Sequence, residues 1–169
     1  MSKLAVQSPT ANMSEMEHSV SAWLLNISDE ETVAISQFEI NHIEEYSEFI
    51  KIPKSPPWCN QVMLWKNQIL PVLDFTKSRN SSLLNETTSD HSFMLAIVRI
   101  FNGNEQGCRY GAIRILHPPV LEKISNDQGR QKNDINSSWK DISLAAFSAG
   151  DVIVPVLNLN ALFGGELKY

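Results

Sequence analysis

Residues 69–75 read Ile-Leu-Pro-Val-Leu-Asp-Phe, and residues 153–159 repeat the pattern as Ile-Val-Pro-Val-Leu-Asn-Leu. Both stretches are apolar runs with a proline in the same place, Pro71 in the first and Pro155 in the second. Proline has no N–H to donate to a central ladder, so the repeated proline predicts the same edge or bulge position in two strands. The alternative is that two apolar strands resemble each other by chance. We interpret the near-repeat as a sign of two equivalent halves.

An Asx residue stands near the end of each run, Asp74 in the first and Asn158 in the second. Asx side chains accept hydrogen bonds from nearby backbone N–H groups, so both residues are predicted to turn or cap the chain that follows. Residues 160–164 are predicted to form one helical turn that ends at a glycine. An aspartate that ends a strand is also a candidate phosphoacceptor, but the asparagine at the equivalent position favours a turn residue at Asp74.

The rest of the chain consists of short apolar or alternating segments separated by turn residues, which is typical of an all-β barrel or sandwich. This pattern places the two runs within a larger series of strands. The predicted strands are residues 22–27, 33–35, 62–65, 69–75, 93–101, 108–116, 143–147 and 152–157.

Turn residues separate several of these strands. Lys66-Asn67 and Gly150-Asp151 each lie between two apolar runs and predict tight hairpins. The glycines within residues 102–107 predict a third reversal. Ser36 and Glu39 have the spacing of a capping box and predict a short helical turn.

The folded part of the chain is predicted to begin after a flexible tail. Residues 1–21 are rich in Ser, Asn, Met and Glu without an apolar period. Residues 22–169 are predicted to form the domain, either one unit or two small intertwined subdomains. Residues 76–91 are polar and predict a linker between the halves, and residues 125–138 predict a surface loop.

The charge balance and the two cysteines indicate a cytoplasmic protein with no nucleic-acid partner. Lys and Arg number 14 against 19 Asp and Glu, which gives a net charge of −5 without a basic cluster, so nucleic-acid binding has little electrostatic support. Cys59 and Cys108 have neither metal-site spacing nor a disulfide-rich setting, which favours reduced thiols in a cytoplasm. No apolar stretch approaches the ~20 residues of a membrane helix, so direct membrane insertion is not expected.

The sequence contains no constellation that carries catalysis. The four histidines are His18, His42, His91 and His117, and none has a zinc-site partner at a suitable spacing. Neither a Gly-x-Ser-x-Gly elbow nor a phosphate-binding glycine loop occurs. We therefore expect no enzymatic activity, no catalytic residues, no metal and no cofactor.

Taken together, these segments resemble the CheW-like chemotaxis coupling proteins. The N-terminal half of that family is similar to residues 34–75, which include Ile-Asn-His-Ile at 40–43 and Val-Met-Leu-Trp-Lys-Asn-Gln-Ile-Leu-Pro-Val-Leu-Asp-Phe at 62–75. The second half follows the same order, with residues 93–99, 110–113 and 150–158 resembling the later strands. The likeness spans about residues 22–163.

The resemblance implies an all-β fold of two SH3-like five-stranded barrels with short helical segments and a groove between them. It also implies a non-enzymatic adaptor that couples a CheA-type histidine kinase, through its regulatory domain, to the cytoplasmic tips of chemoreceptors. β-Barrels joined by polar loops present edge and groove surfaces that suit protein partners.

The family motif is altered at the hairpin. Residues 61–67 read Gln-Val-Met-Leu-Trp-Lys-Asn, where the family usually has Gly-x-x-Asn-Leu-Arg-Gly. His42 replaces a usual Glu and Lys66 a usual Arg, so the expected ion pair becomes a His–Lys pair that forms no salt bridge. Glu44 and Glu45 are the nearby carboxylates that could replace the missing Glu.

By this resemblance the candidate partner-binding residues are His42, Trp65, Lys66 and Asn67. Trp65 is either an interface anchor or a core residue. Trp139, in the second polar loop, either docks the loop or faces a partner.

The departures suggest a divergent member, with a pilus or twitching chemosensory cluster as the candidate system. Two alternatives remain, an auxiliary protein that binds only one partner and a small-ligand-binding β-barrel. An adaptor should have apolar surfaces without convergent titratable groups, whereas a ligand-binding barrel should have a pocket with placed polar residues.

Overall fold

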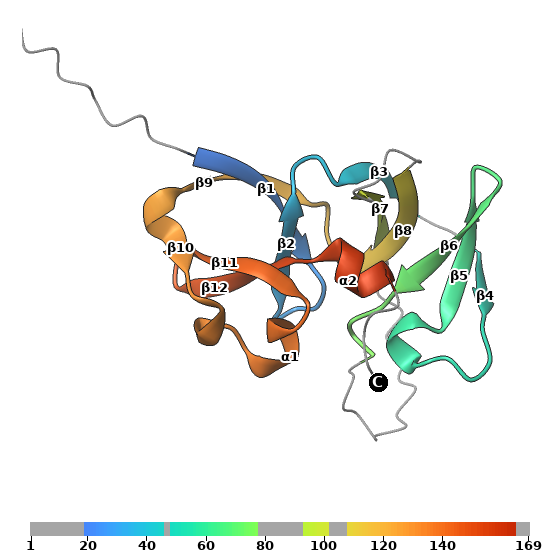
Figure 1. The fold of residues 1–169 in the computed structure, drawn as a ribbon. Coiled ribbons are helices and arrows are strands. Elements are labelled where there is room, and N and C mark those ends of the chain that lie inside the picture. The colour runs from blue at the N-terminus through green and yellow to red at the C-terminus, as the bar shows by residue number, and fades with distance from the viewer. Residues whose placement is uncertain (1–18, 46–47, 78–92, 102–107, 165–169) are drawn as a thin grey trace, which may run out of the picture.

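The computed structural model describes residues 19–45, 48–77, 93–101 and 108–164, which form two six-stranded sheets lying side by side (Figure 1). The first sheet has the order β10-β11-β12-β2-β1-β9 and the second β4-β5-β6-β8-β7-β3. The strands of the first sheet are β1 (Ser19–Asn26), β2 (Thr32–Ser36), β9 (Val120–Ser125), β10 (Gly129–Arg130), β11 (Ser143–Ala149) and β12 (Val152–Leu157). Those of the second are β3 (Ile40–Glu44), β4 (Phe49–Lys51), β5 (Gln61–Trp65), β6 (Gln68–Leu73), β7 (Met94–Phe101) and β8 (Cys108–Ile115).

Short helical segments connect these strands. Three are 3₁₀ turns and two are short α-helices. They are η1 (Pro57–Cys59), η2 (Asn126–Gln128), η3 (Lys132–Asp134), α1 (Ser137–Lys140) and α2 (Leu159–Phe163). Among the described residues, no helix is long and apolar enough to cross a membrane.

Each sheet curls so that its two outermost strands are neighbours in the chain. In the first sheet β9 and β10 are separated only by η2, and in the second β3 and β4 are separated only by residues 45–48. Gln128 of η2 also donates a side-chain hydrogen bond of 3.0 Å to the Ser148 carbonyl oxygen on β11. The predicted fold of two barrels with short helical segments is confirmed, with one difference. Each barrel has six strands instead of five, because β4 and β10 add a short strand each.

The two barrels exchange strands between the two halves of the chain. The first half gives the hairpin β1–β2 to the first barrel and β3–β6 to the second. The second half gives the hairpin β7–β8 to the second barrel and β9–β12 to the first. The strand orders match position by position, so β1–β6 correspond to β7–β12. The near-repeat in the sequence therefore marks equivalent strands, β6 and β12.

The repeated prolines lie in interior strands. Pro71 on β6 pairs with Val62 on β5, and Pro155 on β12 pairs with Ala146 on β11. The prediction of an edge or bulge position is wrong, because β6 and β12 each have a neighbour on both sides and the register runs without a shift through each proline. The parallel pairing of β6 with β8 begins one residue after Pro71, and that of β12 with β2 one residue after Pro155. Proline is tolerated here because the parallel ladder starts beyond it.

Two hairpins have the turn geometry that the sequence predicts. Lys66 and Asn67 have φ angles of 47° and 64°, so both central residues are left-handed, as a type I′ turn requires. Gly150 has a φ of 60° at the first central position of the β11–β12 turn, as in a type II′ turn. The capping-box bond predicted at Ser36 is present, because the Glu39 carboxylate accepts a 2.7 Å hydrogen bond from the Ser36 N–H, but residues 37–39 form a turn and not a helix. The reversal predicted at residues 102–107 lies outside the described residues.

Several predicted boundaries also change. β1 begins at Ser19, so residues 19–21 belong to a strand, and residues 1–18 of the expected tail lie outside the described residues. Most of the expected linker, residues 78–91, does so as well. The apolar pattern did not predict β3, β4, β9 or β10, whose residues are mostly half-exposed or exposed, and only the family resemblance indicated a strand at residues 40–43.

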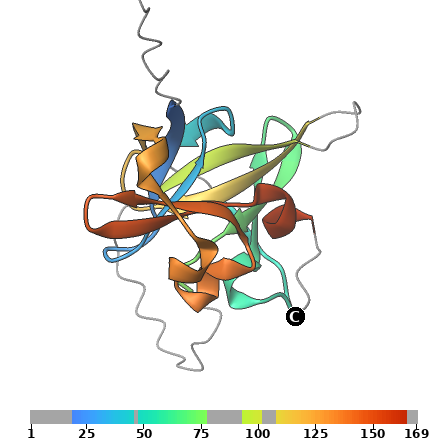
Figure 2. The same ribbon diagram turned by 60° about the vertical axis from the view of Figure 1, so that its left-hand side comes forward.

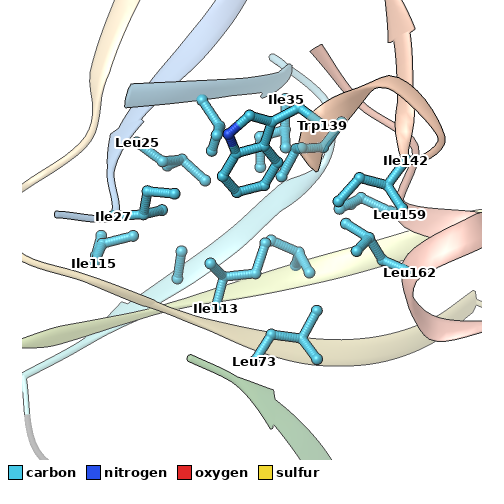
Figure 3. Close-up of a cluster of buried hydrophobic side chains, with 14 of the residues drawn as sticks. Leu25, Ile27, Ile35, Leu73, Ile113, Ile115, Trp139, Ile142, Leu159 and Leu162 are labelled. Carbon is cyan, nitrogen blue, oxygen red and sulfur yellow. The ribbon is translucent and has the colours of Figure 1, made fainter. Parts of the chain in front are cut away.

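One apolar core joins the two barrels. It contains residues from both hairpins, β1–β2 and β7–β8, together with Trp58 on η1 and Trp139 on α1. Figure 3 shows the Trp139 indole ring reaching among these side chains. Trp139 is 8% exposed, so it docks the second polar loop onto the core and does not face a partner. Each barrel also has its own apolar interior.

The equivalent Asx residues hold equivalent connections. The Asp74 N–H donates to the Trp58 carbonyl oxygen at 2.8 Å, and the Asn158 N–H donates to the Ile142 carbonyl oxygen at 2.8 Å. Asn158 also caps α2 by accepting a 3.1 Å hydrogen bond from the Ala161 N–H. The helix then packs on the second barrel, beside β7 and β8 in both views (Figures 1 and 2).

Candidate partner-binding surface

The β5–β6 hairpin and β3 bring together the residues that the sequence singles out. Trp65 ends β5 and is only 7% exposed, and its ring lies 5.3 Å from that of Tyr110 inside the second barrel. The burial identifies Trp65 as a core residue and not as an exposed anchor. It thereby fixes the base of the hairpin, beyond which Lys66 and Asn67 protrude.

Glu44 connects β3 to the hairpin. Its Oε1 accepts a 3.1 Å hydrogen bond from Trp65 Nε1 and lies 3.4 Å from His42 Nε2. The side chains of His42 and Glu44 are 52% and 32% exposed, so solvent screens the interaction between them. Glu44 thus occupies a place between His42 and the hairpin. The sequence offered Glu44 and Glu45 equally, and only the distance to Trp65 distinguishes them.

The hairpin tip presents one cation and one amide. Lys66 Nζ lies 4.4 Å from the centre of the Trp65 ring, a cation–π distance. Lys66 and Asn67 are both exposed. His42 and Lys66 do not pair directly, and both contact groups of the Trp65–Glu44 pair. The tip is therefore a small polar, net basic feature held on a rigid aromatic base.

An apolar surface next to this tip was missed by the sequence analysis. Leu64 and Ile69 are cross-strand partners on the outer face of β5–β6 and are 64% and 71% exposed. Ile50 on the edge strand β4 is 64% exposed and pairs with Val62. We call Ile50, Val62, Leu64, Ile69 and Pro71 the outer strip. Contiguous exposed apolar side chains of this kind mark protein interaction sites.

The outer strip is specific to the second barrel. Aligning β5–β6 with β11–β12 places Ala146 and Pro155 at the positions of Val62 and Pro71. In the first barrel both are buried, and Ala146 belongs to the core shared between the barrels. At these two positions the face is covered in the first barrel and open in the second, whereas Ile153, the counterpart of Ile69, is 36% exposed.

Asp74 anchors the far end of the hairpin from the inside. The carboxylate is buried and accepts a 3.0 Å hydrogen bond from the Arg114 guanidinium on β8 and a 3.1 Å bond from the Thr76 N–H. Lys77 Nζ lies 3.4 Å away. Asp74 is both a turn residue and the partner of a cation on the neighbouring strand. The second role was not apparent from the sequence.

Among the described residues, apolar side chains fill the space between the barrels. In the described parts of the chain, no three His, Cys, Asp or Glu residues are placed to hold a metal ion. Burial raises the pKa of Glu39 and of the Cys59 thiol, and a hydrogen bond from Ser125 lowers the pKa of Asp127. These three groups belong to separate elements.

The two interlinked barrels and the mixed basic and apolar surface define a class of β-barrel scaffold. Comparison with protein families matches the CheW-like domain over residues 23–167, and the chain belongs to this family. The structure is similar to that of the scaffolding protein TtCheW from Thermoanaerobacter tengcongensis, with a TM-score of 0.64 and 15% sequence identity over 89% of this chain and 91% of that one. No curated protein matches the chain. Family membership confirms the prediction of a non-enzymatic scaffold.

Proposed function

We propose that this protein is a cytoplasmic adaptor that couples a CheA-type histidine kinase to the cytoplasmic tip of a chemoreceptor. The observation that carries the proposal is the pairing of the basic hairpin tip with the outer strip on one barrel. A buried apolar centre with a polar rim is the usual anatomy of a protein interface. Lys66, Asn67 and His42 supply the polar part, and Leu64 and Ile69 the apolar part.

The tip also supports a choice of partner different from that of other family members. The usual Glu–Arg pair is absent, and a His42–Glu44 pair stands beside Lys66. A change in rim charges alters which partners are accepted more than it alters the fold. We propose a divergent chemosensory system, with a pilus or twitching cluster as our candidate.

The experiment measures binding of the full chain to its CheA-type kinase and, separately, to the receptor tip from the same genome. Lys66→Glu should weaken at least one of the two by tenfold or more, about 1.4 kcal/mol. Lys132→Glu is the matched control, because it makes the same charge reversal at an exposed residue of the first barrel. Equal affinities for wild type, Lys66→Glu and Lys132→Glu would remove the hairpin tip from the interface.

A second candidate is an auxiliary protein that keeps one interface only. It is favoured by the loss of the Glu–Arg pair while the outer strip stays exposed. In the same assay this function gives measurable binding to one of the two partners and none to the other. Pull-down from the native cell extract then identifies the retained partner and the chemosensory system.

A further inference from the structure

The first barrel contains a cavity of about 350 Å³ that opens between β1, β9 and β11. Its walls include Val20, Ala22, Gly129, Phe147 and Val156. The polar side chains on it are Ser21, Ser36, Ser125 and Asn126, and none of the lining side chains that the structure describes is charged. The volume is in the range of small-molecule sites.

The internal repeat shows what occupies the same space in the second barrel. The parallel pairs Val156–Ala34 and Val72–Ala112 align the two barrels. Gly129 stands opposite Phe147 in the first barrel, as Phe49 stands opposite Met63 in the second. Gly129 therefore corresponds to Phe49.

The β1–β2 hairpin gives three more correspondences. Ser36 corresponds to Arg114, because each lies two residues beyond the parallel-paired alanine. Their cross-strand partners Ala22 and Leu95 therefore correspond, and so do the residues two positions earlier, Val20 and Phe93. All four first-barrel members of these pairs line the cavity.

In the second barrel these positions are filled by aromatic packing. The rings of Phe49 and Phe93 stack with centroids 5.7 Å apart and planes 26° apart. The Arg114 guanidinium covers Phe93 at 3.9 Å from its centroid. In the first barrel Gly129, Val20 and Ser36 take these places. The cavity is the space that two stacked phenyl rings occupy in the other barrel.

We propose that this cavity binds a small uncharged molecule that carries an aromatic ring. Apolar walls that also carry three hydroxyl groups and one amide side chain suit a ring with one polar substituent. A charged ligand is disfavoured, because no lining side chain would compensate its loss of hydration. The site is distinct from the outer strip and the hairpin tip, which belong to the second barrel.

The test is a titration of the full chain with indole, an uncharged aromatic probe with a single N–H donor. Calorimetry measures the binding, and the unfolding temperature is measured with and without indole. Indole should bind saturably with one site per chain and raise the unfolding temperature. Gly129→Phe and Val20→Phe restore the side chains of the second barrel and should each lower indole affinity tenfold or more. A Cβ at position 129 would lie 3.3 Å from the Asn126 backbone carbonyl oxygen, so Gly129→Phe requires η2 to shift by a few tenths of an ångström. Val20→Phe is the second variant in case Gly129→Phe does not fold.

Val152→Phe is the matched control, because Val152 is 56% exposed on β12 and does not line the cavity. Its indole affinity should equal that of the wild type. Absence of saturable binding, or equal binding by both filled variants, would overturn the proposal. Indole binding that is absent from the wild type and appears only in the variant Met13→Ser, Met16→Ser would also overturn it. In that case the N-terminal segment, and not a small molecule, would be the occupant of the cavity. Kinase and receptor binding by the filled variants should stay unchanged, so this proposal and the proposed function fail separately.

Discussion

The Trp65 indole N–H donates a 3.1 Å hydrogen bond to the Glu44 carboxylate and joins the β5–β6 hairpin to β3. The ring itself is packed in the interior of the second barrel. Trp65→Ala should therefore lower the free energy of unfolding by about 3–5 kcal/mol, as expected for loss of a buried aromatic. Trp65→Phe keeps most of the packing and should cost about 1 kcal/mol from the lost hydrogen bond. Urea denaturation of both variants measures the two effects. A Trp65→Ala protein as stable as the wild type would show that Trp65 is not part of the core.

The Lys66-Asn67 turn carries strain that substitution should release. A non-glycine residue in the left-handed region costs about 1–2 kcal/mol, less for asparagine. Type I′ turns favour Asn followed by Gly. The double variant Lys66→Asn, Asn67→Gly should raise the free energy of unfolding by about 1 kcal/mol while weakening partner binding, because Lys66 is lost. As the opposite control, Gly150→Ala in the turn of the first barrel should be destabilising by a similar amount. A double variant less stable than the wild type would contradict the strain argument.

The sequence predicted the fold where local chemistry decides it. Proline-containing runs, left-handed turn residues and Asx caps act over a few residues, so the two halves and their hairpins were predictable. β3 and β9 were not, because Ile-Asn-His-Ile-Glu and Val-Leu-Glu-Lys-Ile-Ser lie at sheet edges and are only partly buried. The exchange of hairpins between barrels has no local signal either. Both halves have the same pattern, and only packing selects which hairpin joins which barrel.

The candidate site was predictable in place but not in detail. The family motif located the hairpin tip and His42, yet β5 is apolar on both of its faces. Nothing in the segment Val-Met-Leu-Trp reveals that Met63 and Trp65 point inward and Leu64 outward. The role of Glu44 depends on contact with a residue 21 positions away. Relations of this kind follow from tertiary packing.

Asp74 and Arg114 form an ion pair whose carboxylate is almost completely buried. Removing one side chain of the pair leaves the charge of the other without its counter-charge in a largely buried site, which is strongly destabilising. Asp74→Ala should lower the free energy of unfolding by about 3 kcal/mol, toward the low end for buried pairs because Arg114 is 21% exposed. Asp74→Leu combined with Arg114→Met should recover part of this loss. Thermal denaturation of Asp74→Leu, Arg114→Met and the double variant gives the coupling, and strictly additive losses would contradict the pairing.

Glu39 should make the protein less stable as the pH rises. Burial raises the pKa of its carboxyl, and the hydrogen bond from the Ser36 N–H offsets only part of this shift. Between the unfolded and the folded pKa the native state binds the extra proton, so stability is highest below the unfolded value and falls as the pH passes through the folded one. Glu39→Gln keeps an acceptor for Ser36 and should remove this slope. Urea midpoints of both proteins across the acidic range measure it, with equal slopes counting against the assignment.

Gly111 on β8 lies directly under the ring of Phe163, and a Cβ at position 111 would overlap that ring. This contact holds α2, which follows β12 of the first barrel, against the second barrel. It should therefore be important for joining the two barrels. Gly111→Ala should destabilise the protein by about 1–3 kcal/mol, the usual cost of overpacking. Phe163→Ala removes buried apolar surface and should cost a comparable amount. The cost stays in this range because the ring is only partly buried. In the double variant the added methyl group occupies space that the ring has left, so its loss should be smaller than the sum of the two single losses. Denaturant unfolding of the four proteins measures this coupling, and additive losses would show that Gly111 and Phe163 act independently.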